Sequence, residues 1–179
     1  MSKNVLILST SLRPGSNSDA LAEAFARGAR EAGNTVEVLS LRGKTMGFCR
    51  GCLACLEKGR CIQNDDAPAM VEKMGRADVL VFATPIYYYE MSGQMKTLLD
   101  RANSLYDSDY AFTDVYLLTA AAEDEAGVDS RAISGLEGWI ACFERARLAG
   151  TVFAGGVNKA GEIQGHKALE EAYRMGSRL

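Results

Sequence analysis

The stretch Val5-Leu-Ile-Leu8, followed directly by Ser9-Thr-Ser-Leu-Arg-Pro-Gly-Ser-Asn-Ser18, decides the fold. Four consecutive apolar residues are typical of a strand that is buried on both faces of a sheet. After the polar loop, apolar residues recur every four positions from Leu21 to Ala29, and Asn17 or Ser18 can cap the helix that this spacing predicts. A buried strand, a polar loop and an amphipathic helix form the first unit of a parallel α/β sheet.

The same unit returns along the rest of the chain. Further strands are predicted at residues 35–39, 79–83, 115–119 and 148–154. Helical patterns separate them and begin near Asp65, at Ser92, at Asp129 or Ser130, and near Gln164. Residues 1–179 are therefore predicted to form one α/β domain, a doubly wound five-stranded parallel sheet with helices on both faces. Ligands of such sheets bind at the carboxyl ends of the strands.

Composition limits the classes of function. The 179 residues hold 20 Lys and Arg against 23 Asp and Glu, and the net charge of −3 argues against a general binder of nucleic acid or of anionic membranes. The apolar runs are far too short to span a bilayer, and Met1–Ser11 lacks the apolar length of a signal peptide. We therefore expect a cytoplasmic protein without nucleic-acid or membrane partners. The single histidine, His166, is expected to be a surface or capping residue.

Four of the five cysteines lie close together in a loop at about residues 47–63, namely Cys49, Cys52, Cys55 and Cys61. In a cytoplasmic chain such clustering indicates metal or redox chemistry before structural disulfides. Four thiolates complete the ligand set of a [4Fe–4S] cluster. Structural zinc also accepts four cysteines, although usually from two separated pairs, and a thiol or disulfide loop without metal is the third alternative. Cys142, beside Phe143 on an apolar helical pattern, is predicted to be a buried small side chain.

The loop after the first strand has the composition of a phosphate site. Its hydroxyls are neutral donors, the following helix offers free N–H groups, and Arg13 can add a charge-assisted hydrogen bond. Neither GxGxxG nor GxxxxGK[ST] occurs here, so the loop suits a terminal phosphate monoester, such as that of FMN, better than a dinucleotide or nucleoside triphosphate. An ordinary turn with capping residues is the alternative.

Two further loops follow buried strands. Thr84-Pro-Ile-Tyr-Tyr-Tyr-Glu-Met-Ser92 combines aromatic faces with backbone groups that can bond the pyrimidine edge of a flavin. Its tyrosines can instead pack in a subunit interface, where Tyr is enriched. Ala120-Ala-Ala-Glu-Asp-Glu-Ala-Gly127 begins with small residues that allow a ligand to approach, although an exposed acidic loop is the equally good alternative.

The chain resembles the iron–sulfur flavoproteins within the flavodoxin-like, NAD(P)H-dependent FMN reductase group. The residues that carry the resemblance are Ser11–Ser18, the Cys49–Cys61 run with Asp65 and Asp66, Thr84–Tyr87, and Gln94–Arg101. The resemblance implies a flavodoxin-like fold, non-covalent FMN, a homodimer or homotetramer with the flavin near an interface, and electrons from NAD(P)H or a ferredoxin. Thr10 departs from the family, which often has Gly there, and so does Ala120–Ala122, where the family loop is usually Gly-rich.

The resemblance and the loops together give the expected site residues. Those expected to contact FMN are Ser11, Arg13, Ser16, Asn17, Ser18, Pro85, Ile86, Tyr87, Tyr88, Tyr89, Ala120 and Ala121. Those expected to hold the cluster are Cys49, Cys52, Cys55 and Cys61. No side chain is assigned a catalytic role, because flavin chemistry belongs to the cofactor.

The predicted function is an FMN-dependent oxidoreductase that passes electrons between NAD(P)H or a ferredoxin and an unknown acceptor, with a [4Fe–4S] cluster on the cysteine loop. Two alternatives stay open. One is a non-catalytic, flavodoxin-like electron-transfer protein. The other is an FMN reductase whose cysteine loop binds no cluster.

Overall fold

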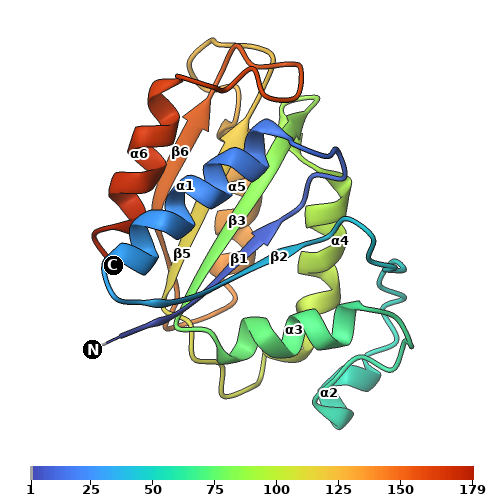
Figure 1. Ribbon diagram of the computed structural model, residues 1–179. Helices are drawn as coiled ribbons and strands as arrows, with labels where there is room; N and C mark the ends of the chain where they lie inside the picture. Colours follow the sequence, from blue (N-terminus) through green and yellow to red (C-terminus); the bar gives the residue numbers. More distant parts are fainter. Residues whose placement is uncertain (1) are drawn as a thin grey trace.

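The computed structural model describes residues 2–179 and contains a twisted sheet with a parallel core (Figure 1). Five parallel strands pair in the order β2-β1-β3-β5-β6, and their bounds are β1 (Asn4–Ser9), β2 (Thr35–Ser40), β3 (Val79–Tyr87), β5 (Asp114–Ala120) and β6 (Arg147–Ala154). The predicted doubly wound, flavodoxin-like sheet is confirmed. A sixth strand, β4 (Glu90–Met91), pairs antiparallel with the end of β3. Its two residues are too few to show the alternation of apolar and polar residues from which a strand is predicted.

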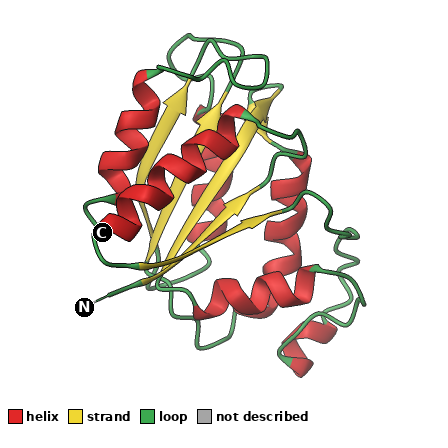
Figure 2. Ribbon diagram, in the orientation of Figure 1, coloured by secondary structure: helices red, strands yellow, loops and turns green. Residues whose placement is uncertain are grey.

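Helices cover both faces of this sheet (Figure 2). Helices α1 (Asn17–Glu31) and α6 (Lys167–Gly176) pack on one face. The other face carries α3 (Ala67–Arg76), α4 (Gly93–Arg101) with its 3-10 extension η1 (Ala102–Leu105), and α5 (Ser130–Ile140). A short helix, α2 (Ala54–Lys58), lies inside the cysteine loop and stands away from the sheet (Figure 1). No helix among residues 2–179 is long and apolar enough to cross a membrane.

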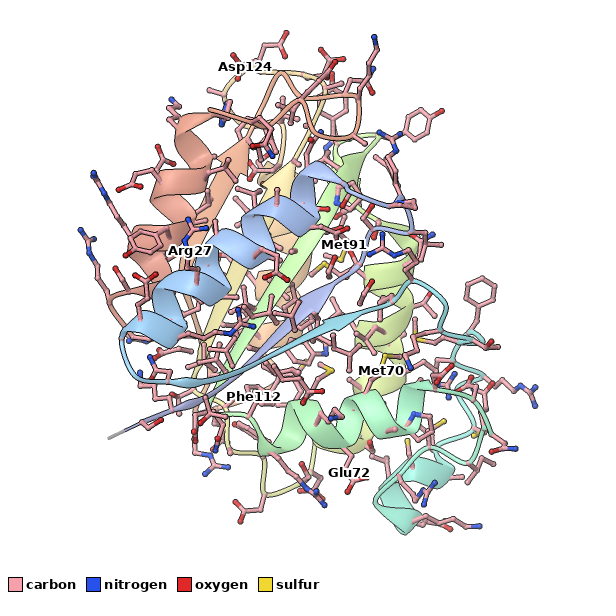
Figure 3. The ribbon with its side chains drawn as sticks, viewed as in Figure 1. Arg27, Met70, Glu72, Met91, Phe112 and Asp124 are labelled. Atoms are coloured by element: carbon pink, nitrogen blue, oxygen red, sulfur yellow. The ribbon has the colours of Figure 1, made fainter. Side chains whose placement is uncertain are left out.

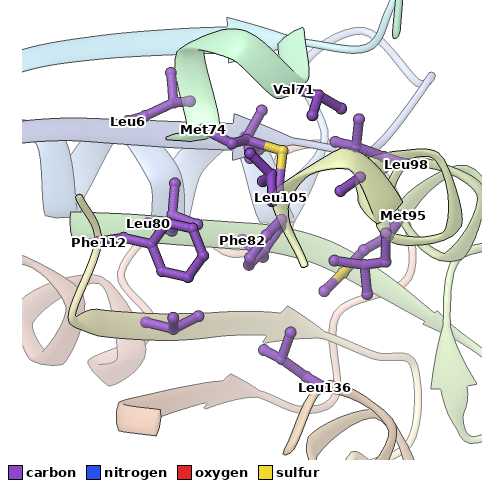
Figure 4. Packing of buried hydrophobic residues seen from close by; sticks show 14 of the residues in the cluster. Leu6, Val71, Met74, Leu80, Phe82, Met95, Leu98, Leu105, Phe112 and Leu136 are labelled. Atoms are coloured by element: carbon purple, nitrogen blue, oxygen red, sulfur yellow. The ribbon is translucent and has the colours of Figure 1, made fainter. Parts of the chain in front are cut away.

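The central strand β3 explains why both layers form. Its residues alternate between the faces, so Leu80 and Phe82 pack against α3 and α4, whereas Val79 and Val81 pack against α1 and α6. Figure 4 shows the first of these two cores, in which Phe82 lies near Met95 of α4. Burial on both faces is what the continuous apolar run of this strand predicts.

Helices α1 and α6 approach unusually closely. A Cβ atom at Gly28 would lie 2.1 Å from the carbonyl oxygen of Tyr173, and one at Gly176 would lie 2.2 Å from that of Phe25. Glycine at both positions therefore allows the two backbones to meet. Arg27, labelled in Figure 3, lies 5.2 Å from the centre of the Tyr173 ring and adds a cation–π contact across the same pair.

Three local predictions have clear outcomes. Ser16, rather than Asn17 or Ser18, caps α1, and its hydroxyl accepts a hydrogen bond from the Asp19 N–H at 3.1 Å. His166 caps α6, with Nδ1 accepting from the Ala168 N–H at 3.1 Å. The predicted burial of Cys142 is wrong, because this residue is exposed. Helix α5 ends at Ile140, so the helical period no longer sets which side Cys142 faces.

Candidate functional site

A pocket of about 270 Å³ lies at the carboxyl ends of β1, β3 and β5. We call it the switch-point pocket, because the strand order reverses between β1 and β3, which is where doubly wound sheets bind ligands. Its walls are Ser11, Arg13, Ser16, Asn17, Ser18, Pro85, Ile86, Tyr87, Tyr88, Ala120, Ala121, Ala122, Val157 and Asn158. The structure thus brings together eleven of the twelve residues expected to contact FMN, all except Tyr89.

Buried serine hydroxyl groups at the start of α1 line one end of the pocket. Ser11, Ser16 and Ser18 are all buried, and the hydroxyls of Ser16 and Ser18 lie 3.3 Å apart. The fifteen-residue helix α1 directs its positive dipole end and its unpaired N–H groups to the same place. This end of the pocket therefore favours an anion.

Two of the expected phosphate residues have other partners. The Asn17 side chain donates to the Lys159 carbonyl at 3.0 Å and accepts from the Ile163 N–H at 3.3 Å. The Arg13 guanidinium donates to the Asn158 carbonyl at 2.6 Å. Both side chains thus fasten the loop at residues 157–163 over the pocket.

That loop is braced a second time by Glu162. Its carboxylate accepts hydrogen bonds from the N–H groups of Lys159 and Asn158, each at 2.7 Å. The bonds from Lys159 and then Asn158 hold the pKa of Glu162 below its ordinary value. No sequence pattern indicated that Val157 and Asn158 line the pocket, because this region follows the last strand and carries no recognisable motif.

The aromatic end of the pocket has an unusual backbone. Tyr88 and Tyr89 have φ angles of 51° and 66°, in the left-handed region that bulky residues rarely adopt. Tyr88 is 97% exposed, whereas Tyr89 turns toward α5, with the Arg131 guanidinium 5.9 Å from its ring centre. Strained conformations of this kind gather at functional sites.

Thr10 joins the loop that follows β1 to the tyrosine loop that follows β3. It is fully buried, and its hydroxyl donates to the Ala83 carbonyl of β3 at 3.1 Å and lies 3.1 Å from the hydroxyl of Ser92. Ser92 also caps α4, as predicted, and its backbone N–H donates to the Thr84 hydroxyl at 3.1 Å. A hydroxyl at position 10 therefore fixes one loop against the other.

The third loop closes the pocket beside β5. The backbone of Ala121 bonds that of Ala154 and Val157, each at 2.9 Å. Asp124, labelled among the upper loops in Figure 3, packs on Gly155, where a Cβ would lie 2.4 Å from the Asp124 carboxylate. The alanines thus form part of the wall, while the acidic residues begin beyond it.

A second cavity, of about 460 Å³, lies between the cysteine loop, α4, η1 and the end of α5. We call it the cysteine cavity, because all four clustered cysteines and Cys142 line it. Trp139 and Phe143 form an aromatic wall on the α5 side. No lining residue is shared with the switch-point pocket.

A buried ion pair anchors the cysteine loop. The Arg101 side chain is fully buried and donates to both carboxylate oxygens of Asp65, at 2.6 and 2.9 Å, and to the Gly47 carbonyl at 2.7 Å. The hydrogen bond from Arg101 is the main reason why the pKa of Asp65 lies below its ordinary value. The ion pair therefore joins both ends of the loop to α4.

The same segment places donors against two of the cysteines. Arg101 Nη2 lies 3.3 Å from Cys61 Sγ, and Asn103 Nδ2 lies 3.3 Å from Cys55 Sγ. Burial alone would raise the pKa of Cys61, but the backbone hydrogen bond at Gln63 and the Arg101 guanidinium outweigh it, so this pKa lies below its ordinary value. One cysteine of the loop is therefore biased toward its thiolate.

Sequence reasoning missed Arg101 and Asn103. A signal for Arg101 existed, because it lies three residues after Leu98 and thus on the apolar face of the predicted helix, where a charged side chain needs a buried partner. Asn103 carried no such signal, since η1 begins where the helical period ends.

Comparison with known proteins places this geometry in a family. A family model described as NADPH-dependent FMN reductase matches residues 3–134, which is well over half of the chain. The chain belongs to this family.

The chain is also similar to several curated proteins in sequence and to solved structures in fold. An iron-sulfur flavoprotein of Methanosarcina thermophila is 25% identical over 94% of this chain and 85% of its own length. One of Methanocaldococcus jannaschii is 35% identical over 56% of this chain. The chain spans 52% of that protein and 39% of an iron-sulfur flavoprotein of Archaeoglobus fulgidus. The solved NAD(P)H:quinone oxidoreductase from Methanothermobacter marburgensis superposes with a TM-score of 0.72 at 21% identity, over 99% of this chain and 97% of its own.

Proposed function

We propose that the protein is an FMN-dependent oxidoreductase that takes electrons from NAD(P)H or a ferredoxin and passes them to an acceptor. FMN would lie in the switch-point pocket, and a [4Fe–4S] cluster would be held by Cys49, Cys52, Cys55 and Cys61. The observation that carries the proposal is the pocket itself, which has an anion-favouring end and an aromatic end at the β1/β3 reversal of an FMN reductase family member.

The pocket residues fit the two ends of FMN. Ser11, Ser16 and Ser18 would donate to the phosphate beside the start of α1, and Arg13 adds positive charge at the rim. The loop from Pro85 to Tyr89 would hold the ring at the other end. Bound FMN supplies the chemistry of accepting a hydride and releasing electrons singly, while the protein binds and orients it. Ala120 and Ala121 leave room on the β5 side.

The cysteine cavity fits a thiolate-ligated group by its chemistry. Five thiols line one cavity, four of them from the cysteine loop, and two side-chain donors lie against sulfurs of that loop. Among residues 2–179, no three acid, cysteine or histidine side chains lie close enough to bind one metal ion. A bound cluster would exchange one electron at a time.

Assembly and location complete the proposal. Tyr88, which stands free at the pocket mouth, suits a homodimer or homotetramer with the flavin near an interface. Several free cysteines close together in one loop are typical of a protein in the reducing cytoplasm. Residues 1–179 would act as one flavodoxin-like domain, with the cysteine loop at about 47–63 as its insertion.

The test is steady-state oxidation of NADH and NADPH by the purified, FMN-loaded protein with a quinone or ferricyanide as acceptor. We expect turnover that disappears when FMN is removed and returns when it is added back. Negligible turnover with both nucleotides, together with rapid flavin reduction by a reduced ferredoxin, would favour the non-catalytic carrier instead. Failure to bind FMN would contradict both.

A further inference from the structure

Segment 101–103, at the junction of α4 and η1, forms one wall of the cysteine cavity and is the part of the scaffold that meets the cysteine sulfurs. Two side chains from it reach different cysteines, Arg101 toward Cys61 and Asn103 toward Cys55, each with a nitrogen 3.3 Å from Sγ. The two cysteines belong to opposite ends of α2, because Cys55 lies in this helix and Cys61 follows it. Donors from one rigid segment therefore contact two points of a loop.

Other partners hold the Arg101 side chain in its place beside the cavity. Arg101 is held by Asp65 and the Gly47 carbonyl, and its exposed fraction is only 2%. Its Nε–H has no partner within residues 2–179, and Arg101 lines the cavity. The bonds to Asp65 and the Gly47 carbonyl therefore fix Arg101 in place beside Cys61.

We infer that Arg101 and Asn103 are positioning residues for the proposed cluster, which orient Cys61 and Cys55 and set the reduction potential of the group that these cysteines hold. This inference rests on the proposed function. Hydrogen bonds to ligand sulfurs favour the more negatively charged, reduced state and so raise the potential. Removing one donor lowers it.

The fold gives this segment a second significance. Helix α4 begins directly after the tyrosine loop of the switch-point pocket and ends at Arg101. Nine residues of α-helix rise by about 13 Å, so one short rigid element connects the two cavities. The two donors therefore lie at the end of the helix that fixes the position of the cysteine cavity relative to the tyrosine loop.

The test compares two variants. Asn103→Leu keeps the side-chain size but loses the N–H groups. Arg101→Lys keeps the positive charge but loses the planar guanidinium, which donates to Asp65 and Cys61 at the same time. Ser108→Ala is the matched control, because its hydroxyl bonds only the Leu105 carbonyl nearby. Each protein is reconstituted anaerobically with iron and sulfide. Iron, sulfide and FMN are then counted, and the cluster potential is measured by redox titration followed by electron paramagnetic resonance.

We expect Asn103→Leu to keep FMN and to lower the ratio of reduced to oxidised cluster at a fixed electrode potential, by roughly threefold to tenfold. We expect Arg101→Lys to lose part of its iron as well, and Ser108→Ala to match the wild type. An unchanged potential in Asn103→Leu, with wild-type iron content, would overturn the inference alone. Loss of both iron and FMN in that variant would also overturn it, as a general folding defect. A wild type that binds FMN but no iron would overturn the cluster proposal and the inference together.

Discussion

In the proposed function, the hydroxyl groups at the start of α1 are the groups on which FMN binding would depend most directly. Ser16 uses its oxygen to accept from Asp19, and the Ser18 side chain is buried beside it. Among residues 2–179, the hydroxyl hydrogens of Ser16 and Ser18 thus have no acceptor other than a neighbouring hydroxyl, and a ligand in the pocket would supply one. An anionic phosphate is the acceptor that such a cluster of donors favours.

Ser18→Ala tests this role. We expect FMN to bind about tenfold more weakly, because one hydrogen bond to a charged group is lost, while the unfolding midpoint in urea changes little. Fluorescence titration of the flavin measures the affinity, and Ser108→Ala, remote from the pocket, is the control. An unchanged affinity would remove Ser18 from the phosphate site.

Glu162 makes the pocket loop sensitive to acid. Its pKa is lowered in the folded protein, so its contribution to stability is complete above its ordinary pKa of about 4.3 and is lost as the pH falls through the folded value. Glu162→Gln should therefore lower the urea midpoint at pH 7, and the difference from the wild type should shrink below about pH 4. A difference that stays constant with pH would show that the charge of Glu162 is not what braces the loop.

At the scale of elements, the contact between α1 and α6 depends on two glycines. Gly28→Ala places a methyl group against the Tyr173 carbonyl and should lower the free energy of unfolding by about 2 kcal/mol, as overpacking does. Gly138→Ala in α5 is the control, since nothing lies within 4 Å of its Cβ position and alanine favours a helix there. Urea unfolding of both variants measures the difference. Equal stability of the two would mean that the helices can separate without cost.

The elements were predictable to the extent that their pattern is local. Buried strands such as Val79–Ala83 and caps such as Ser92 follow from apolar runs and capping chemistry, and both are present. Cys142 was misplaced because a helix end cannot be located from an apolar spacing alone. Helix α2 was missed because its five residues leave no periodic pattern and bury no side chain.

For the whole molecule, prediction depended on which residues must meet in space. The walls of the switch-point pocket that follow β1, β3 and β5 were predictable, because the carboxyl ends of parallel strands share one edge. The loop holding Asn158 was not, since its contacts with Arg13 and Asn17 join residues about 145 positions apart. Likewise, the pairing of Arg101 with Asp65 appears only when α4 packs beside the cysteine loop.

The switch-point pocket and the cysteine cavity make the central claim testable, because they share no lining residue. The measurement is the content of FMN, iron, acid-labile sulfide and zinc per chain, with the absorption spectrum, in anaerobically purified wild type and Cys52→Ser. We predict one FMN, four iron and four sulfide in the wild type. Cys52→Ser should keep its FMN and lose its iron. A wild type that contains stoichiometric zinc, or no metal, or a Cys52→Ser variant that loses FMN together with iron, would contradict a flavin and a cluster held in separate cavities of this chain.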